Sequence, residues 1–412
     1  MNAAAYQDEV MTENTIGHIF DGTFHSAQTW PARHKNYHIG DLTAPQQCEI
    51  NTGNKIMGSE FFRTFLLDVK KRGASDLLLT AGASPQIRIN GTLEQLASPP
   101  LHKDELQHLV EELLSERQQM MLESYKAIDF SRDFEDIAKF RFNIYFQRGA
   151  PAIAARIIPD EIPCFSELGL PKIIQEFASR PSGLFLVTGP AGSGKSTTLA
   201  TMVDYINRHR KLHIITIEDP IEYEHHHMNS IVDQREVGSD AESFADALHS
   251  MFRQSPDVIM VGELRDLETI HLALTLAETG HLILATLHTQ DTSHAISRIV
   301  DVFPAEQQQQ IYFQLSQVLL GVVAQQLIMT NDGSKRVLAC EIMRVNSGIR
   351  SLIREMRSEQ IYSMIQAGRS EGMITMNESL RELLALDLIH EQAALSKTTN
   401  PKELLRLIEA HV

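Results

Sequence analysis

The sequence predicts an α/β protein in which a small α+β domain precedes a larger domain built on a mainly parallel β-sheet. The first observation is a glycine-rich loop, GPAGSGKS at 189–196, that lies between an apolar β-rich run and a helical pattern. The second is the alternation of apolar runs with helical segments after that loop. The third is the mixture of short helical and strand-like segments before it. A chain of 412 residues is long enough for two or three domains of this kind.

Residues 1–57 predict a poorly ordered extension. This segment is rich in Ala, Thr, Asn, Gln and His and shows no sustained hydrophobic periodicity. Its histidines lack the regular spacing of metal ligands, so we expect them to be solvated side chains.

Residues 58–160 predict the small α+β domain, and residues 161–181, which hold three prolines, predict a linker with one intervening helix. The small domain is expected to contain, in chain order, a helix, two strands, a second helix and two further strands, at 61–73, 76–82, 85–91, 104–122, 139–146 and 152–159.

Residues 182–412 predict the larger domain. Its expected strands are near-continuous apolar runs separated by helical segments, which is typical of a parallel sheet covered on both faces. These runs lie at 184–187, 213–217, 258–261 and 281–287. From about residue 304 the pattern is almost wholly helical, with one strand pair expected around RVLACEIM at 336–343.

Composition narrows the class of protein. Lys and Arg total 37 against 53 Asp and Glu, and this net charge of −16 argues against an extended nucleic-acid surface. Three widely separated cysteines supply neither a disulfide framework nor a four-cysteine zinc site. We therefore expect a cytoplasmic protein that contacts a membrane only through partners.

The glycine-rich loop carries the groups that bind a nucleoside triphosphate. Its glycines let backbone N–H groups turn toward an anion, and the following helix adds the positive end of its dipole. Lys195 is placed to neutralise the terminal phosphates, and the Ser196 hydroxyl is placed to ligate Mg²⁺. The residues predicted to bind ATP are Gly189, Pro190, Ala191, Gly192, Ser193, Gly194, Lys195, Ser196 and Thr197.

Polar side chains are predicted at the ends of three neighbouring strands, where a phosphate-loop enzyme holds Mg²⁺ and activates water. Glu218 ends one apolar run and Glu263 follows another. We assign Glu263 to orienting or deprotonating the attacking water, with contact to Mg²⁺ through water, and Glu218 is the next candidate for both roles. His288 follows the third run and either senses the γ-phosphate or is structural.

Phosphoryl transfer also needs positive charge that stabilises the transition state. Arg141, Arg148 and Arg156 alternate with apolar positions on the last expected strands of the small domain. An exposed strand face has the same pattern. Three arginines nearer the loop in sequence are rival candidates: Arg235, Arg253 and Arg265.

Together these residues make the chain resemble the secretion ATPases of type II secretion and type IV pili. The loop matches the Walker A motif of that family, IEDPIEY its aspartate box, GELRD its Walker B motif with glutamate, and GHLILATLHT its histidine box. Further similar segments are RGASDLLLTAG, FNIYFQRGAP, DQREVG and DVFPAEQQQQ, so that the resemblance covers about Ser59 to Leu380. Leu78 and Ala191 depart from the usual residues of the family, but neither departure removes a catalytic group.

One segment resembles the retraction branch of this family. GIRSLIRE at 348–355 is similar to the AIRNLIRE motif associated with pilus retraction, and IYSMIQAG follows it. The resemblance implies coupling of the motor to its partner through Arg350, Leu352 and Arg354. Pilus extension and type II secretion ATPases are expected to carry a four-cysteine insertion that this chain lacks, so retraction is favoured over assembly.

The resemblance implies a homohexameric ring built from a PAS-like N-terminal domain and a RecA-like ATPase domain. ATP and Mg²⁺ would lie between the two domains, with Arg148 and Arg156 as arginine fingers. The implied partners are pilus system components, including an inner-membrane platform protein, and the implied location is the cytoplasmic face of the bacterial inner membrane.

Other functions stay open at this point. Within the family, the alternatives are an accessory pilus ATPase and an ATPase of type IV secretion or conjugation. A nucleic-acid-dependent RecA-like ATPase is disfavoured by the net charge and by the absence of aromatic-basic clusters. A nucleotide-binding scaffold without hydrolysis is the weakest alternative.

Overall fold

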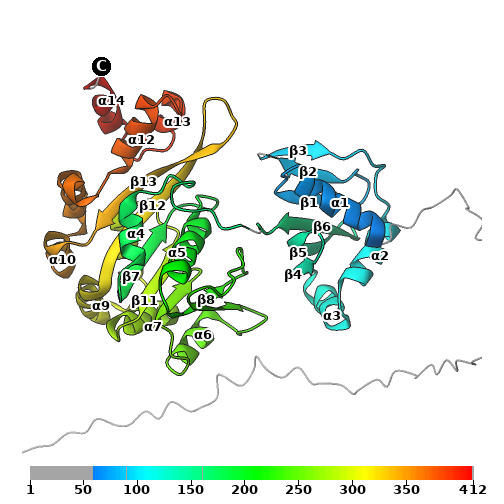
Figure 1. Cartoon of the computed structure of the whole chain (residues 1–412), viewed down its shortest axis with the longest axis horizontal. Coiled ribbons are helices and arrows are strands. Elements are labelled where there is room, and N and C mark those ends of the chain that lie inside the picture. Colours follow the sequence, from blue (N-terminus) through cyan, green and yellow to red (C-terminus); the bar gives the residue numbers. More distant parts are fainter. Residues whose placement is uncertain (1–58, 90, 160, 411–412) are drawn as a thin grey trace, which may run out of the picture. The chain divides into compact units, whose positions relative to one another are not determined.

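The computed structural model describes residues 59–89, 91–159 and 161–410 (Figure 1). The extension expected at residues 1–57 lies outside this range. Two β-sheets organise the described residues, one of six strands and one of seven. We refer to residues 59–159 as the N-terminal domain and to residues 161–410 as the C-terminal domain. None of the helices in these ranges is both long and apolar enough to cross a bilayer.

The N-terminal domain is an antiparallel sheet with three helices. Its strand order is β3-β2-β1-β6-β5-β4. Its elements are α1 (Ser59–Lys71), β1 (Asp76–Thr80), β2 (Gln86–Ile89), β3 (Thr92–Gln95), α2 (Lys103–Leu113), α3 (Glu116–Tyr125), β4 (Ala127–Phe134), β5 (Ala138–Gln147) and β6 (Ala150–Ile157).

Alternation along β5 explains how this sheet buries one face. Phe140, Phe142 and Ile144 are fully buried, whereas Arg141 and Asn143 between them are half-buried. Successive side chains of a strand point to opposite faces, so the aromatic face packs into the core and the other face carries the polar groups.

Three expectations for the N-terminal domain need correction. The helix expected at 104–122 is two helices, because Leu114 is extended and the Ser115 side chain accepts a hydrogen bond from the Gln118 N–H, which starts α3. The strands β3 and β4 were not expected. They are short of apolar residues, with no buried side chain in β3 and two in β4, so they lack an apolar run.

The C-terminal domain is built on a sheet in which all strands are parallel except β13. The strand order is β13-β12-β7-β11-β10-β8-β9. The elements are α4 (Lys172–Ala178), β7 (Gly183–Thr188), α5 (Lys195–His209), β8 (His213–Glu218), β9 (Ile231–Glu236), α6 (Phe244–Met251), β10 (Val258–Val261), α7 (Leu267–Glu278), β11 (Leu282–Leu287), α8 (Thr292–Val300), α9 (Ala305–Val318), β12 (Leu319–Met329), β13 (Arg336–Arg344), α10 (Ser347–Arg354), α11 (Ile361–Ala367), α12 (Met376–Ala385), α13 (Glu391–Leu395) and α14 (Pro401–Glu409).

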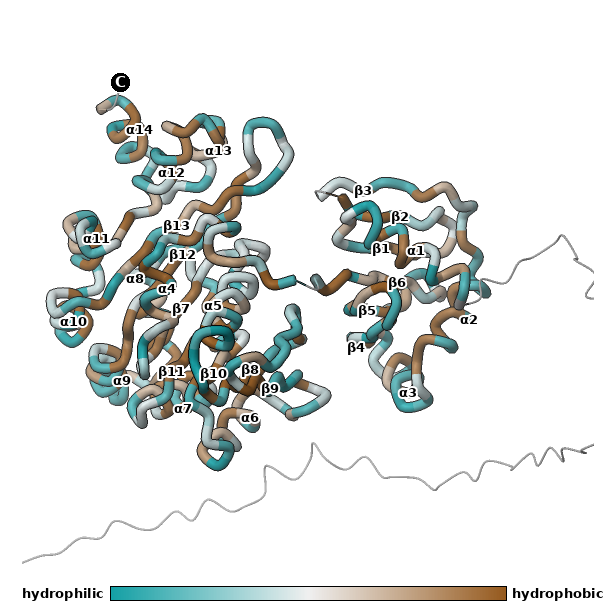
Figure 2. Tube along the Cα trace, in the orientation of Figure 1, coloured by the Kyte–Doolittle hydropathy of each residue, from teal (hydrophilic) through white to brown (hydrophobic). Residues whose placement is uncertain are grey.

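Helices cover both faces of this sheet, as its apolar strands predicted. In β7, Leu184 and Leu186 belong to the core shared with α6 to α11, whereas Phe185 and Val187 belong to the core shared with α4 and α5. Figure 2 shows hydrophobic residues along the central strands. Because helices cover both faces of the sheet, polar functional groups can gather at the two ends of its strands. We call these ends the amino edge and the carboxyl edge of the sheet.

One strand of this domain, and the position of another in the sheet, were not expected from the sequence. β9 is an edge strand with one buried side chain, so it has no apolar run. β12 and β13 form the antiparallel strand pair expected around RVLACEIM. The position of β12 beside β7 was not expected, and the continuous helical part begins at Ser347 rather than near residue 304. The two glutamines within β12 hide its apolar character, although Gln325 is completely buried.

Candidate nucleotide site

The glycine-rich loop joins the carboxyl end of β7 to the first turn of α5. Gly189 and Gly194 have φ angles of 141° and 88°, a region that favours glycine. A Cβ atom on Gly189 would clash with the Gln325 carbonyl oxygen. The loop therefore requires glycine at this position both for its backbone angle and for its close approach to β12.

Lys195 lies at the start of α5 and is 8% exposed. Its Nζ donates hydrogen bonds to the carbonyl oxygens of Gly189, at 2.9 Å, and Pro190, at 3.1 Å. Burial lowers the pKa of Lys195, and the negative charges of Glu263 and Glu222 oppose that shift. A phosphate group would compete with the two carbonyl oxygens for this ammonium.

A cavity of about 240 Å³ lies beside the loop, and the predicted carboxylates meet there. β11, β10 and β8 follow β7 in the sheet order, so their carboxyl ends form one edge next to the loop. The residues that line the cavity include Lys195, Ser196, Glu218, Glu222, Glu263, Arg265, Thr286 and His288. The structure thus brings together the loop, both predicted glutamates and the predicted histidine.

Glu218 ends β8 and is 7% exposed. It accepts hydrogen bonds from the Thr216 hydroxyl, at 2.7 Å, the Gln234 amide, at 3.1 Å, and the Glu222 N–H, at 3.4 Å. Burial raises the pKa of Glu218 to about 6, and the hydrogen bonds limit this shift. Its environment therefore permits proton exchange near neutral pH.

Glu263 follows β10 and is held through both of its carboxylate oxygens. Arg265 Nη2 forms a close ion pair with Oε1, and His288 Nε2 lies 3.2 Å from Oε2. Glu263 has 12% of its side chain exposed, whereas Arg265 and His288 are 68% and 54% exposed. The carboxylate is therefore fixed in orientation by two groups that solvent, or a bound phosphate, can reach.

Sequence reasoning missed several supporting residues. Thr216 lies two positions before Glu218 on the same strand, so its position on the same face is a signal that the sequence contained. Gln234 belongs to the unexpected strand β9, and no sequence signal connected it to Glu218. Arg265 was considered as a source of charge for the transition state, and its contact with Glu263 was not expected.

Arg148 and Arg156 lie in the N-terminal domain. Arg148 is exposed in the turn after β5 and has a φ angle of 49°. Arg156 on β6 donates from Nε to Asp76 Oδ1 at 2.7 Å and remains 66% exposed. Of the rivals, Arg235 bonds the Ser250 hydroxyl and the Asp240 carbonyl oxygen, which gives it a role in holding β9 to α6. The assignment of arginine fingers stays a prediction.

α10 (Ser347–Arg354) contains all of the GIRSLIRE segment except Glu355, which follows its last residue. Leu352 is half-buried and packs against the main core, and Arg350 Nη1 donates to the Gln317 carbonyl oxygen at 3.1 Å. Arg354 is exposed and donates to the Ser351 hydroxyl at 3.2 Å. Of the three residues assigned to motor coupling, Arg354 is therefore the one most available to a partner.

Comparisons with known proteins identify the family. The family described as type II/IV secretion system protein matches residues 156–408. The Pseudomonas aeruginosa protein named type IV pilus retraction ATPase PilT is 46% identical over 81% of this chain and 96% of its own length. A Neisseria gonorrhoeae twitching motility protein is 43% identical over 79% of this chain and 87% of its own length.

A solved structure of the pilus retraction motor PilT with bound ADP has the same fold. It superposes with a TM-score of 0.77 at 48% sequence identity and covers 83% of this chain and 98% of the PilT chain. The family match at residues 156–408 includes the phosphate-binding loop. The match to the Pseudomonas protein spans 333 residues, which is more than the C-terminal domain alone. The chain therefore belongs to the type II/IV secretion system protein family of ATPases, among the relatives of PilT.

Proposed function

We propose that this chain hydrolyses ATP to drive the retraction of a type IV pilus. The observation that carries the proposal is the pocket in which Lys195, Glu218, Glu263 and His288 meet, in a chain 46% identical to a pilus retraction ATPase over 81% of its length. The proposed assembly is a homohexamer, and the proposed partners are pilus components with an inner-membrane platform protein. The proposed location is the inner face of that membrane.

The pocket supports a division of labour in phosphoryl transfer. Lys195 neutralises the terminal phosphates, and Glu263 orients the attacking water or accepts its proton, with Glu218 as the next candidate for that role. Arg265 and His288 hold Glu263 through its two oxygens. Because a γ-phosphate also attracts both groups, its arrival and departure would change how firmly Glu263 is held.

The oxygen-rich lining of the pocket fits Mg²⁺. The Ser196 hydroxyl and the carboxylates of Glu218 and Glu263 line the cavity, and Mg²⁺ prefers such oxygen ligands. Within the described ranges, no cluster of three His, Cys, Asp or Glu side chains is arranged to hold a metal by itself. Mg²⁺ held by these residues would supply positive charge that neutralises the phosphates.

Arg148 and Arg156 are the proposed arginine fingers. Both side chains are largely exposed. Arg156 would exchange its ion pair with Asp76 for a phosphate, and the buried Asp76 carboxylate would keep the Arg88 guanidinium and the Ser75 hydroxyl as partners. Placement of these groups on a separate domain would link phosphate binding to domain movement, through the different affinities of the two arrangements for ATP and ADP.

The first experiment tests hydrolysis. Glu263→Gln keeps the size of the side chain but removes the carboxylate, and we expect kcat for ATP to fall by about 10²- to 10³-fold, since general-base catalysis contributes on this scale. Glu268→Gln, an exposed glutamate on α7, is the matched control. A Glu263→Gln variant that hydrolyses ATP at the parent rate would refute the catalytic assignment.

The second experiment tests retraction. Arg354→Ala should leave ATP hydrolysis within about twofold of the parent, because an exposed side chain of this kind contributes little to stability, while twitching of a complemented strain is lost. Arg406→Ala, which removes an exposed arginine on α14, should twitch normally. Normal twitching by the Arg354→Ala variant would show that this residue does not couple the motor to its partner. If a strain that lacks the chain loses secretion but still twitches, the chain is instead a secretion ATPase.

A further inference from the structure

An open cavity of about 1020 Å³ lies at the sheet edge away from the nucleotide pocket. Leu319 and Leu320 at the start of β12 line it, as does Arg344 at the end of the antiparallel β13. β12 and β7 run parallel, so both begin at this amino edge. The six residues of β7 separate the two edges by about 20 Å. The cavity is therefore distinct from the nucleotide site, which occupies the carboxyl edge.

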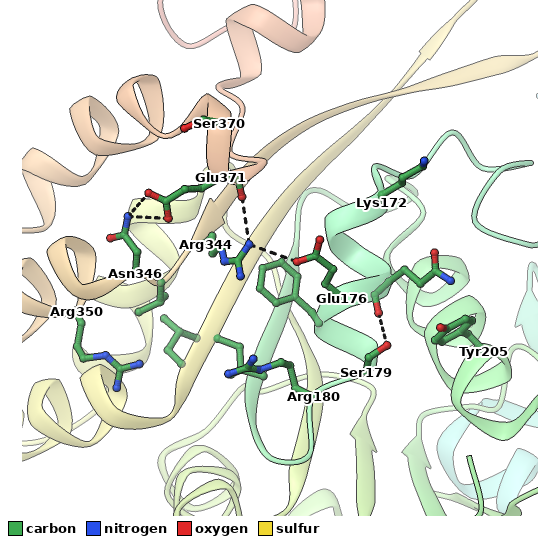
Figure 3. A pocket seen from close by; sticks show the side chains of 15 residues that line it. Lys172, Glu176, Ser179, Arg180, Tyr205, Arg344, Asn346, Arg350, Ser370 and Glu371 are labelled. Carbon is green, nitrogen blue, oxygen red and sulfur yellow. Dashed lines mark hydrogen bonds and ion pairs between the residues drawn. The ribbon is translucent and has the colours of Figure 1, made fainter. Parts of the chain in front are cut away.

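The charged groups on one wall of this cavity satisfy one another. Arg344 Nη1 donates to Glu176 Oε2 at 3.3 Å and to the Glu371 carbonyl oxygen at 3.5 Å, and the Asn346 amide donates to both Glu371 carboxylate oxygens (Figure 3). Arg344 therefore has little remaining positive charge to offer a ligand, and Lys172 is the exposed cation on this wall.

Arg180 and Arg350 form the other end of the cavity and lack such partners. They point toward each other in Figure 3, and both also line an adjoining cavity of about 500 Å³. In the described part of the chain, no carboxylate pairs with either guanidinium, and Arg350 donates only to the Gln317 carbonyl oxygen. Two guanidinium groups beside an open cavity suit carboxylates, which accept from arginine in a bidentate manner.

The remaining lining selects among anionic ligands. Leu320 and Tyr205 are half-buried and supply apolar surface, which a densely charged phosphate ligand does not need. Glu176 has 62% of its side chain exposed and repels concentrated negative charge. A peptide that alternates carboxylate and apolar side chains matches both the arginines and the apolar surface.

We propose that this cavity docks an acidic, partly apolar peptide segment of the protein on which the motor acts, and that Arg180 and Arg350 bind its carboxylates. The proposal rests on the proposed motor function and adds to it a binding site and the chemistry of its ligand. Arg180 lies before β7, far in sequence from the GIRSLIRE segment, and only the fold brings it to the same cavity as Arg350.

β12 connects the cavity to the nucleotide pocket. It begins with the cavity-lining Leu319 and continues to Gln325, whose side chain bonds Thr198 of α5 and whose carbonyl oxygen closely approaches Gly189. A segment docked at the amino edge therefore contacts the same strand that packs against the phosphate-binding loop.

The first experiment measures binding by the full chain to a fluorescein-labelled peptide of three Glu-Leu repeats, with three Lys-Leu repeats as the reference peptide. We expect saturable binding of the acidic peptide only. Arg180→Glu and Arg350→Glu should each weaken it by about tenfold or more, whereas Arg406→Glu should not. Equal binding of both peptides, or an unchanged affinity in the two variants, would overturn the proposal.

Two competitors distinguish the source of the negative charge. Inorganic phosphate, or vesicles containing phosphatidylglycerol, should bind the parent and Arg180→Glu equally. The opposite result would be that phosphate or the vesicles bind the parent more tightly than Arg180→Glu and displace the labelled peptide at a lower concentration than unlabelled peptide does. The cavity would then be a phosphate or lipid site, and the peptide proposal would be wrong.

A functional experiment separates this proposal from the proposed function. Arg180→Glu should retain ATP hydrolysis within about twofold of the parent and should lose twitching. Arg180→Lys, which keeps the positive charge, should retain part of the twitching. If the parent chain hydrolyses ATP and supports twitching, but Arg180→Glu does so equally well, only the docking site is refuted. If the parent itself fails to support twitching, the proposed function fails first, and peptide binding still tests the cavity.

Discussion

The charged side chains at the carboxyl edge of the seven-stranded sheet have partners within the domain, whereas two arginines at the amino edge lack carboxylate partners among the residues described. At the carboxyl edge, the cavity is about 240 Å³, and Lys195, Glu218 and Glu263 all have partners within the domain. At the amino edge, the cavity is about 1020 Å³, and Arg180 and Arg350 have no carboxylate partner among the residues described. The first edge is organised before a ligand arrives, whereas the second leaves charge for a partner to satisfy.

This difference matches two physical requirements. Phosphoryl transfer depends on groups that are already oriented when the substrate binds, because reorganisation during the reaction raises the barrier. Docking of a protein segment depends instead on accessible charge and apolar surface, and it tolerates an open site. The sheet thus separates chemistry and partner binding by about the length of one strand, and a single strand, β12, contacts both regions.

The largest expected effect is at the carboxyl edge. Lys195→Ala should reduce ATP hydrolysis by about 10³-fold, because it removes the buried positive charge that faces the phosphates. Phosphate release by the purified chain measures this effect. Lys211→Ala, which removes an exposed lysine just after α5, is the control. A loss of less than about tenfold in Lys195→Ala would show that the carboxyl edge does not depend on this preorganised charge.

A smaller effect is expected where β12 meets α5. The Gln325 side chain and the Thr198 hydroxyl are buried and bond only each other, at 2.8 and 3.2 Å, in the described part of the chain. Thr198→Val keeps the shape but leaves the amide unpaired, which should lower the free energy of unfolding by about 1–3 kcal/mol. Urea unfolding of the parent and the variant measures this difference.

Two further variants isolate the hydrogen bond in this pair. Thr198→Ser retains the hydroxyl and should stay close to the parent in stability. Combining Thr198→Val with Gln325→Leu removes both polar partners and should recover much of the loss, since no buried group is then unpaired. If the double variant is as unstable as the sum of its single variants, packing rather than the hydrogen bond links β12 to the loop.

The sequence predicted the carboxyl edge well because its residues follow apolar strands. The runs at 184–187, 258–261 and 281–287 correspond to β7, β10 and β11, and parallel order then brings their ends together. The ends carry Lys195, Glu263 and His288, so a local pattern was sufficient to predict that these residues meet. Their chemical roles stay predictions.

The amino edge could not be predicted in the same way. Arg180 and Arg350 are 170 residues apart, and they reach one cavity only because β12 inserts beside β7. The position of β12 beside β7 was not predicted, because Gln325 and Gln326 interrupt the apolar run of a strand that is nevertheless mostly buried. Similarly, Leu352 belongs to a family-like motif, and only the fold shows that it is half-buried against the core; its role in motor coupling stays a prediction.

The smallest expected effect concerns Glu218, and it tests whether preorganisation at the carboxyl edge costs stability. The pKa of Glu218 is raised from 4.5 to about 6 in the folded chain, so the folded state holds this proton more tightly than the unfolded state. Its contribution to stability is therefore complete below about pH 4.5 and is lost as the pH rises through about 6. At pH 8 the ionised, buried carboxylate costs about 2 kcal/mol.

Glu218→Gln removes this ionisation but adds amide donors that lack acceptors in the parent arrangement. We therefore expect the variant to gain at most about 2 kcal/mol over the parent at pH 8 and to lose that advantage by pH 4.5, where the parent carboxyl is protonated. Urea unfolding at pH 4.5, 6 and 8 measures the difference, with the exposed Glu268→Gln as the control. A difference that does not vary with pH would mean that the buried charge of Glu218 costs no stability. A gain in stability at pH 8 together with slower ATP hydrolysis would identify Glu218 as a catalytic group that is kept at a cost in stability. The amino edge, which only binds a partner, needs no group of this kind.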